Sequence, residues 1–302
     1  MFGRRAHAAR RASSQLGALE QSVDLLLLNP GRLLATQNRA NPSTRLQDHE
    51  FKVFSQWGED GILQRLVSVI PIRHRTFIEF GVEDFREANC RFLLEKDNWS
   101  GFVLDGSQEH IARLRSRPIF WRHHVAAEAA FITRENISGL LAKSGFDHEL
   151  GILSIDLDGN DYHILEALSE WRPCIIVIEY NAVFGCDRAI TVPYDAAFTR
   201  WRAHFSGLFT GCSLAAAAHL AERMGYALVG TNSAGNNAFF VRRDLVTPQV
   251  EVLTVAEAFT DSVFHDSRAQ DGSMSHLVGT ARLAAIRGLP VLNVVTGQVE
   301  PL

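Results

Sequence analysis

The stretch Thr76–Phe77–Ile78–Glu79–Phe80–Gly81–Val82–Glu83–Asp84 decides the expected fold. Apolar residues lead into an acid, and a glycine follows two positions later. A short apolar run that stops at a glycine predicts a buried parallel strand followed by a tight turn. The glycine lets the backbone approach a ligand, and a carboxylate accepts N–H or O–H donors. We therefore expect Glu79 and Gly81 to lie at a ligand-binding turn.

A second strand is expected at Gly101–Gly106, and the crossover helix at Arg91–Lys96. Asp105 follows Glu79 by 26 positions. An acid about 20 residues beyond the glycine turn holds ribose hydroxyls in a Rossmann-type unit. The two acids therefore favour a nucleoside cofactor. Gly81 does not begin a GxGxxG motif, which argues against a pyrophosphate site, whereas S-adenosylmethionine carries no phosphate.

The composition predicts a globular protein without a general nucleic-acid or membrane surface. The chain has 302 residues, of which 46% are hydrophobic and 21% charged, and its net charge is −4. The four cysteines form no CxxC pair, which favours reduced thiols and a cytoplasmic location. No run of about 18 apolar residues is present, so no stable membrane insertion is expected.

Three regions are expected along the chain. Residues 1–50 are a basic N-terminal tail and linker, residues 51–247 an α/β domain, and residues 248–302 a C-terminal extension of unassigned role. The apolar block Leu25–Leu28 predicts a short helix that docks elsewhere, with a homo-oligomer as one way to cover it. We expect residues 1–45 to be dispensable for ligand binding.

A polar cluster at residues 55–61 precedes a helical apolar rhythm and predicts a helix N-terminus. Its polar side chains have two explanations, which the sequence leaves open. Glu59 would suit the positive end of the helix dipole. Alternatively, Gln56 and Glu59 reach the ligand pocket from this helix.

The remaining pattern completes a doubly wound, Rossmann-like α/β fold. A third strand is expected at Phe120–Val125 and a crossover helix at Asn136–Ser144. Two late strands, at 226–230 and 238–242, predict an antiparallel hairpin at the sheet edge. With two further strands, described next, the expectation is a mostly parallel seven-stranded sheet.

Polar residues crowd the exits of those two further strands. The run Ile155–Asp156–Leu157–Asp158–Gly159–Asn160–Asp161–Tyr162 ends one strand, and Glu179 and Asn181 end the next. Buried carboxylates must be hydrogen-bonded, paired or bound to metal. Because ligands of α/β sheets bind outside the carboxyl ends of the strands, we expect these acids to share one crevice.

With these residues in view, residues 51–245 resemble the FkbM-like branch of class I S-adenosylmethionine-dependent methyltransferases. The resemblance rests on the order and spacing of several short motifs, which are Phe77–Gly81, Glu87–Asn89, Trp99–Phe102 leading to Asp105, Ile155–Tyr162, Glu179–Asn181 and Asn237–Val241. It implies that Glu79 and Gly81 meet the methionine part of the cofactor and Asp105 its ribose. Gln56 and Asp156 are assigned to the same cofactor site.

The resemblance also implies O-methylation of a sugar or another hydroxyl-bearing small molecule or glycan, with Asp158 and Asp161 near the acceptor. A hydroxyl acceptor needs a base as it attacks, and Asp158, Asp161 and His163 are candidates, with Glu179 in the same catalytic group. A divalent cation held by Asp158, Glu179 and Asn181 would lower the acceptor's pKa instead. We favour the metal-free arrangement, because no histidine ligand is evident.

Two other classes of protein remain open. Asp156–Leu157–Asp158 after an apolar run also fits the metal-binding DxD motif of nucleotide-sugar glycosyltransferases. The pair of Glu79 and Asp105 fits such an enzyme less well. The third possibility is a catalytically inactive Rossmann-like binding module.

Overall fold

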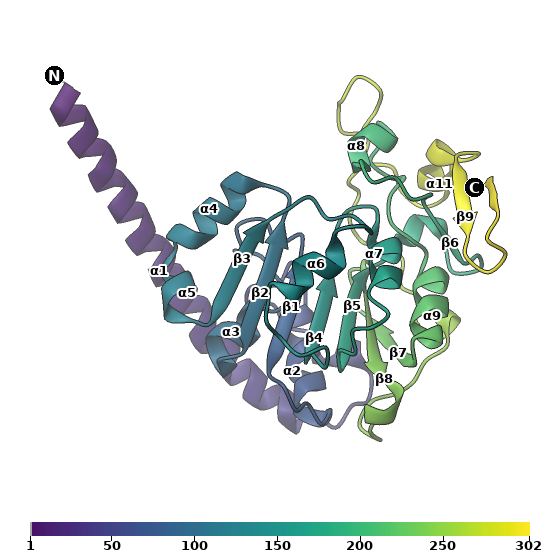
Figure 1. The fold of residues 1–302 in the computed structure, drawn as a ribbon, viewed down its shortest axis with the longest axis horizontal. Coiled ribbons are helices and arrows are strands. Elements are labelled where there is room, and N and C mark those ends of the chain that lie inside the picture. Colours follow the sequence, from purple (N-terminus) through teal and green to yellow (C-terminus); the bar gives the residue numbers. More distant parts are fainter. Residues whose placement is uncertain (1) are drawn as a thin grey trace.

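The fold is built on a seven-stranded sheet. A computed structural model describes residues 2–302, with the side chains of Gln15 and of Gly17 onward. The strand order is β3-β2-β1-β4-β5-β8-β7, in which β1 to β5 run parallel and β8 lies antiparallel between β5 and β7 (Figure 1). The expected fold class and edge hairpin are confirmed. The strands are β1 Thr76–Phe80, β2 Ser100–Asp105, β3 Val125–Ala129, β4 Ile152–Ile155, β5 Ile175–Glu179, β7 Tyr226–Thr231 and β8 Asn237–Arg242.

Helices cover both faces of this sheet. Successive strand residues point to opposite faces, so Phe77 packs with the helices of one face and Ile78 with those of the other. The first face is covered by α2 (Glu59–Val69), α3 (Arg91–Asp97), α4 (Gln108–Ser116) and α5 (Pro118–Arg122). The second is covered by α6 (Ile137–Ala142), α7 (Asp161–Ala167) and α9 (Leu214–Arg223).

The third strand lies later in the chain than the sequence suggested. Pro118 stands at the first turn of α5, where its fixed φ suits a helix and its missing N–H costs nothing. Residues 120–122 are therefore helical, and the expected strand at Phe120–Val125 is wrong. β3 begins at Val125 and pairs with β2 from Gly101 to Asp105.

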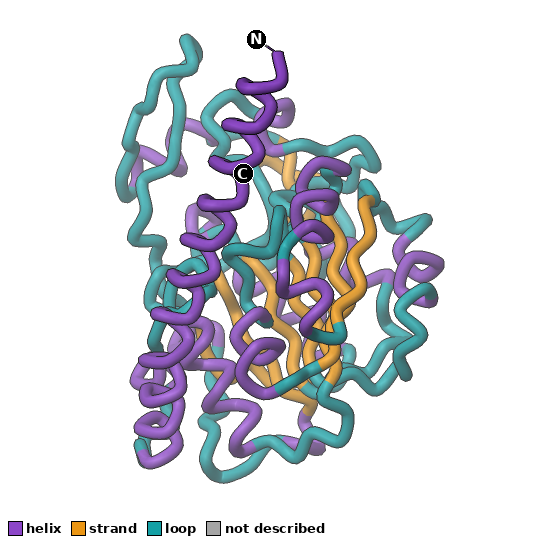
Figure 2. Tube along the Cα trace, turned by 90° about the vertical axis from the view of Figure 1, so that its left-hand side faces the viewer, coloured by secondary structure: helices purple, strands orange, loops and turns teal. Residues whose placement is uncertain are grey.

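The N-terminal region is not a loosely attached tail. Helix α1 spans Phe2–Ala40, and its C-terminal half lies along the first face of the sheet domain (Figure 2). Leu28 and Ala35 are buried in a cluster with Phe92. The side-chain amide of Asn38 donates to the carbonyls of His49 and Gly61 at 3.0 and 2.9 Å.

The expected linker is part of the folded domain. After α1 comes the 3₁₀ helix η1 (Leu46–His49), in which both Leu46 and His49 are buried. The polar composition of residues 41–49 predicted a linker, but these side chains form hydrogen bonds within the domain. Asn41 and Ser43 donate to Asp48, and His49 hydrogen-bonds Asn38. Removing residues 1–45 would expose Phe92 and leave the Asn38 partners unpaired, so we expect such a truncation to destabilise the domain. That residues 1–45 are dispensable for ligand binding stays a prediction.

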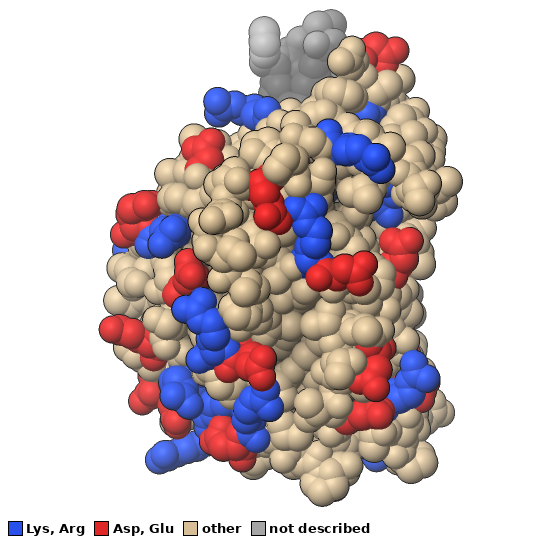
Figure 3. All heavy atoms as spheres, turned by 90° about the vertical axis from the view of Figure 1, so that its right-hand side faces the viewer, with Lys and Arg blue, Asp and Glu red and all other residues tan. Residues whose placement is uncertain are grey.

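The C-terminal extension builds a second, smaller sheet of order β10-β9-β6. Phe184, Leu208, Ile286 and Val291 share its apolar core, so the chain end packs against an excursion that follows β5. Its elements and neighbours are η2 Ala182–Phe184, β6 Ile190–Thr191, α8 Arg200–Ala203, η3 Arg243–Leu245, α10 Val255–Ala258, α11 Thr280–Ile286, β9 Pro290–Asn293 and β10 Val299–Pro301. The face drawn in Figure 3 intersperses acidic and basic side chains.

Within the described residues, no helix has the length and apolar character needed to cross a membrane. All four cysteines are free thiols, and Cys90, Cys174 and Cys212 are buried. Burial raises the pKa of these three thiols, which keeps them protonated and unreactive. The structure thus uses them as small core residues.

Candidate functional site

One cavity of about 670 Å³ opens at the carboxyl ends of the parallel strands. Its lining comes from the exits of β1, β2, β4 and β5, together with the loop after β3. The strand order turns between β1 and β4, and this switch point is where doubly wound sheets bind ligands. The volume falls in the range of roughly 300–1,000 Å³ that suits a small molecule or cofactor.

Glu79 is the second-last residue of β1 and anchors the loop that follows the strand. Its side chain is 3% exposed, and it accepts hydrogen bonds from the backbone N–H groups of Asn89 and Cys90 at 2.7 and 3.0 Å. Burial raises the pKa of Glu79 to about 7 against the opposing effect of these donors. The carboxyl group lines the cavity and holds the start of α3 in place.

Gly81 allows β1 and β4 to meet at the cavity. Its φ is +70°, and a Cβ there would lie 1.8 Å from the carbonyl oxygen of Asp156. No side chain fits that space without movement of the backbone. The glycine read from the sequence is therefore required by a close approach between two strand exits.

Asp105 ends β2 and holds the next two turns. One carboxylate oxygen accepts from the N–H of Glu83 at 2.8 Å, and the other accepts from the N–H of Ser107 at 2.7 Å. His110 places Nδ1 3.2 Å from the second oxygen. Asp105 is buried and lines the cavity at the end nearest β3, where Phe131 follows that strand.

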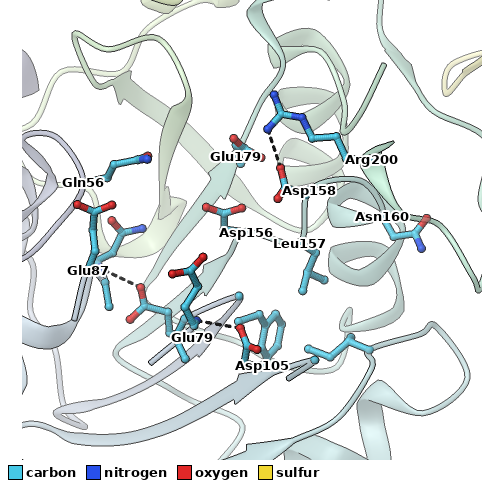
Figure 4. A pocket seen from close by; sticks show the side chains of 18 of the residues that line it. Gln56, Glu79, Glu87, Asp105, Asp156, Leu157, Asp158, Asn160, Glu179 and Arg200 are labelled. Carbon is cyan, nitrogen blue, oxygen red and sulfur yellow. Dashed lines mark hydrogen bonds and ion pairs between the residues drawn. The ribbon is translucent and has the colours of Figure 1, made fainter. Parts of the chain in front are cut away.

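A cluster of three acids lies at the other end of the cavity. Asp156 and Asp158 follow β4, Glu179 ends β5, and one oxygen from each carboxylate lies within 4.8 Å of the others (Figure 4). The expected convergence of Asp158 and Glu179 is confirmed, and Asp156 joins them. The site can share one proton, or it can hold a divalent cation, because carboxylate oxygens are ligands of hard cations.

Two of the three acids lack protein partners. No hydrogen bond or ion pair within the described chain reaches the carboxylates of Asp156 and Glu179, and burial followed by repulsion between neighbouring acids raises both pKa values well above the usual range. Asp158 differs, since it is exposed and pairs with Arg200 at 3.2 Å. This half-buried pair therefore gains most from a proton or a cationic ligand.

Asp161 does not join the cavity lining. It is fully buried, and its two oxygens accept from the N–H groups of Leu157 and Gly159 at 2.7 and 2.9 Å. Asp161 thereby closes the turn that carries Asp158, whose φ is +51°. Its place in the structure is that of a positioning residue, which differs from the expected place beside an acceptor.

His163 and Asn181 also lie outside the lining. The Nε2 atom of buried His163 bonds the carbonyl of Val192 at 2.9 Å. The Asn181 amide donates to the carbonyls of Leu208 and Thr210, while its oxygen accepts from a following N–H. Because neither side chain lines the cavity, neither is placed to act there as a base or as a metal ligand.

Gln56 and Glu59, from the polar cluster at the start of α2, have different places in the structure. Gln56 is exposed and lines the cavity, as expected if residues before α2 reach the ligand pocket. Glu59 is buried away from it and accepts from the side-chain amides of Asn232 and Asn237 at 2.7 and 2.9 Å. Glu59 thus ties α2 to the β7–β8 hairpin.

The far wall of the cavity comes from segments for which no role was expected from the sequence. Arg200 forms ion pairs with Asp158 and Asp266 at 3.2 and 3.4 Å and so links β4 to the C-terminal extension. Phe264, from that extension, stacks on Trp57 with ring centroids 6.0 Å apart. These loops have no periodic pattern, so nothing in the sequence singled them out.

The cavity is strongly acidic. Among the residues that the structure describes, its lining holds one arginine and eight carboxylates, which are Glu79, Glu83, Glu87, Asp105, Asp156, Asp158, Glu179 and Asp266. Such a lining attracts cations and repels phosphates. The fold and the site together define a Rossmann-like α/β protein with an acidic ligand cavity at its switch point.

Neither a family model nor a curated protein matches the sequence. Solved structures with a similar arrangement include the CurJ carbon methyltransferase, at 11% identity over 77% of this chain and 70% of that one, with a TM-score of 0.37. The N-terminal domain of EvdMO1 with SAH bound covers 70% and 94% at 12% identity, with a TM-score of 0.40. A precorrin-6y C5,15-methyltransferase from Geobacter metallireducens covers 66% and 95% at 13% identity, with a TM-score of 0.36. Such identities describe a likeness of fold alone.

Proposed function

We propose that the protein is an S-adenosylmethionine-dependent methyltransferase that transfers a methyl group to a hydroxyl of a small molecule or glycan. The observation that carries the proposal is the acidic switch-point cavity, with Glu79 and Gly81 at the β1 exit and Asp105 at the β2 exit. The cofactor bears a sulfonium and an ammonium group, so this charge suits it. It has no phosphate and needs no glycine-rich phosphate loop.

The cofactor would lie along the β1, β2 and β3 exits. Asp105 would accept from the ribose hydroxyls, and the apolar loop around Phe131 would cover the adenine. Glu79, Gln56 and Asp156 would surround the methionine part. A cationic ammonium group beside Glu79 would favour the ionised carboxylate, so we expect proton release from this group when the cofactor binds.

The acceptor would lie between the acid cluster and the far wall formed by Arg200 and Trp201. The bound cofactor would supply an activated methyl group, so the acceptor oxygen would form its C–O bond as the C–S bond broke, with a neutral thioether as the second product. Asp158, Asp156 or Glu179 would take the hydroxyl proton. Close approach and in-line alignment supply much of the rate, since the sulfonium is already activated.

The glycosyltransferase alternative fits this cavity less well. A nucleotide diphosphate would enter among eight carboxylates with one arginine to offset them. A glycosyltransferase would need a divalent cation held by Asp156, Asp158 and Glu179 to bind the diphosphate. The inactive binding module remains the outcome if ligand binds without turnover.

Calorimetry with S-adenosylhomocysteine and with UDP plus manganese tests the proposal. We expect S-adenosylhomocysteine to bind with micromolar affinity, or about −8 kcal/mol, without added metal. Manganese-dependent binding of UDP, together with no response to S-adenosylhomocysteine, would support the glycosyltransferase instead. Methyl transfer from labelled cofactor to a panel of glycans and hydroxylated metabolites then identifies the acceptor.

A further inference from the structure

Helix α1 carries two apolar faces, and the domain covers one of them. The inner face packs on the domain through Leu28 and Ala35, which are 6% and 1% exposed. The helix lies so close that a Cβ on Gly31 would stand 2.6 Å from a methyl carbon of Val53. This contact fixes the orientation of α1 and determines which residues face away from the domain.

The second face is an outer stripe, which we define as Leu19, Val23, Leu26, Pro30 and Leu33. Each residue of α1 turns the chain by about 100°, so Leu28 lies roughly 200° around the helix from Leu26. The leucines of the outer stripe are 62–70% exposed and Val23 is 44% exposed. Single exposed apolar residues are ordinary, but a continuous row of them marks an interaction surface.

The spacing of the outer stripe is that of a coiled-coil seam. Its members follow one another at intervals of four, three, four and three residues. This 3.5-residue repeat places apolar side chains at the a and d positions of a heptad. Leu27 and Leu34, at 43% and 37% exposure, widen the seam on one side.

The charges around the outer stripe suit a second copy of the same helix. Its other flank carries the neutral residues Ser22, Asn29 and Thr36. The nearby acids turn back to their own domain, where Glu20 pairs with Arg86 and Asp24 with Arg91, both at 2.7 Å. A two-fold related helix would therefore meet the stripe without opposing like charges.

A membrane surface fits these observations less well. A helix that lies in a lipid interface combines a broad apolar face with lysine or arginine along its edges. The two described arginines of α1, Arg32 and Arg39, lie about 120° and 140° around the helix from Leu26, nearer to Leu28 on the inner face than to the outer stripe. The outer stripe between residues 19 and 37 therefore lacks a cationic border.

The shape of the molecule supports the same occupant. The N-terminal part of α1 extends past the edge of the sheet domain (Figures 1 and 2). A helical segment without tertiary packing is marginal below about 12–15 residues. Glu20 is already tied to the domain by Arg86, so the outer stripe begins at Leu19, where this segment ends. A partner helix that continues past Leu19 would give the segment the packing that its own domain does not supply.

We propose that the protein forms a symmetric homodimer through the outer stripes of two α1 helices. The seam is narrow compared with the 20–30 residues per side of a standard interface, so the dimer forms with a dissociation constant on the order of micromolar. The cavity lining includes no described residue of α1, so each copy retains a complete cavity. Dimerisation and ligand binding are thus independent properties.

Sedimentation equilibrium of the full chain, from about 1 to 100 μM, tests the proposal. The test variant is Leu26→Glu combined with Leu33→Glu, which places charges opposite their own copies. The matched control is Arg32→Glu, which changes charge on the same helix outside the outer stripe. Circular dichroism and thermal unfolding check that all three proteins fold alike, which we expect because the stripe is not in the core.

The wild type and the control should pass from monomer to dimer with rising concentration. The double variant should remain monomeric, with affinity weakened at least roughly tenfold. A monomeric wild type at every concentration, or a dimer that survives both glutamates, overturns the proposal. A wild type that stays monomeric but binds phosphatidylserine vesicles through Leu26 and Leu33 would assign the stripe to a membrane instead.

Discussion

Replacement of Asp105 by alanine should weaken cofactor binding while leaving the sheet folded. In the proposed complex the carboxylate accepts from two ribose hydroxyls, and each hydrogen bond to a charged group contributes about 1.5–3 kcal/mol. Loss of one such bond lowers affinity roughly tenfold or more. Asp105→Asn keeps one acceptor oxygen and should show a smaller loss. Calorimetric titration with S-adenosylhomocysteine measures both variants.

The structure also supplies the control for this experiment. Asp105 holds the N–H of Ser107, two positions later, so part of any effect could come from a loosened turn. Asp147 makes the same contact with the N–H of Glu149 at 3.0 Å, and neither residue belongs to the cavity lining. Asp147→Asn should leave the dissociation constant unchanged. If Asp105→Ala folds, with a normal melting temperature, and also binds with wild-type affinity, Asp105 does not contact the cofactor.

Three other outcomes follow from the acid cluster. Asp158→Asn should lower turnover about 10²-fold or more and leave S-adenosylhomocysteine affinity nearly intact, because the lost group acts on the acceptor; equal losses in both would place it in the cofactor site instead. Turnover should rise with pH as the raised pKa values of Asp156 and Glu179 are passed. Arg200→Gln should move this rising limb of the pH profile to higher pH, because the arginine lowers both pKa values. A rising limb at unchanged pH would show that Arg200 does not act on the base. Dialysis against EDTA should leave turnover unchanged, and activity lost to the chelator and restored by magnesium would make the three acids metal ligands.

The sheet could be predicted because each strand carries its own local signal. β1 and β2 are apolar runs that end at an acid and a glycine, and their burial on both faces permits such runs. The third strand was misplaced because Phe120 and Trp121 have high strand propensity, whereas Pro118 sets the helix that contains them. At that point the helix start set by Pro118 outweighed the strand propensity of the two aromatic residues.

The site was predictable only where it lies at strand exits. Asp156, Asp158 and Glu179 converge because neighbouring parallel strands bring their ends together, which a one-dimensional pattern can anticipate. Arg200 and Asp266 reach the cavity from loops far along the chain. Their placement depends on the packing of the second sheet, and that packing leaves no periodic trace in the sequence.

The three acids of residues 156–161 have two different roles. Asp156 and Asp158 line the cavity, and Asp161 holds the turn between them in place. Asp158 adopts a left-handed backbone conformation that costs a non-glycine residue about 1–2 kcal/mol. The two backbone hydrogen bonds to Asp161 offset that cost, since bonds to a charged acceptor are stronger than neutral ones. The strained turn aims Asp158 at Asp156 and Glu179, where like charges repel (Figure 4). Such a turn persists only because its surroundings enforce it, and strain of this kind gathers at functional sites. The buried Asp161, which does not line the cavity, is therefore what holds the exposed Asp158 at the cavity.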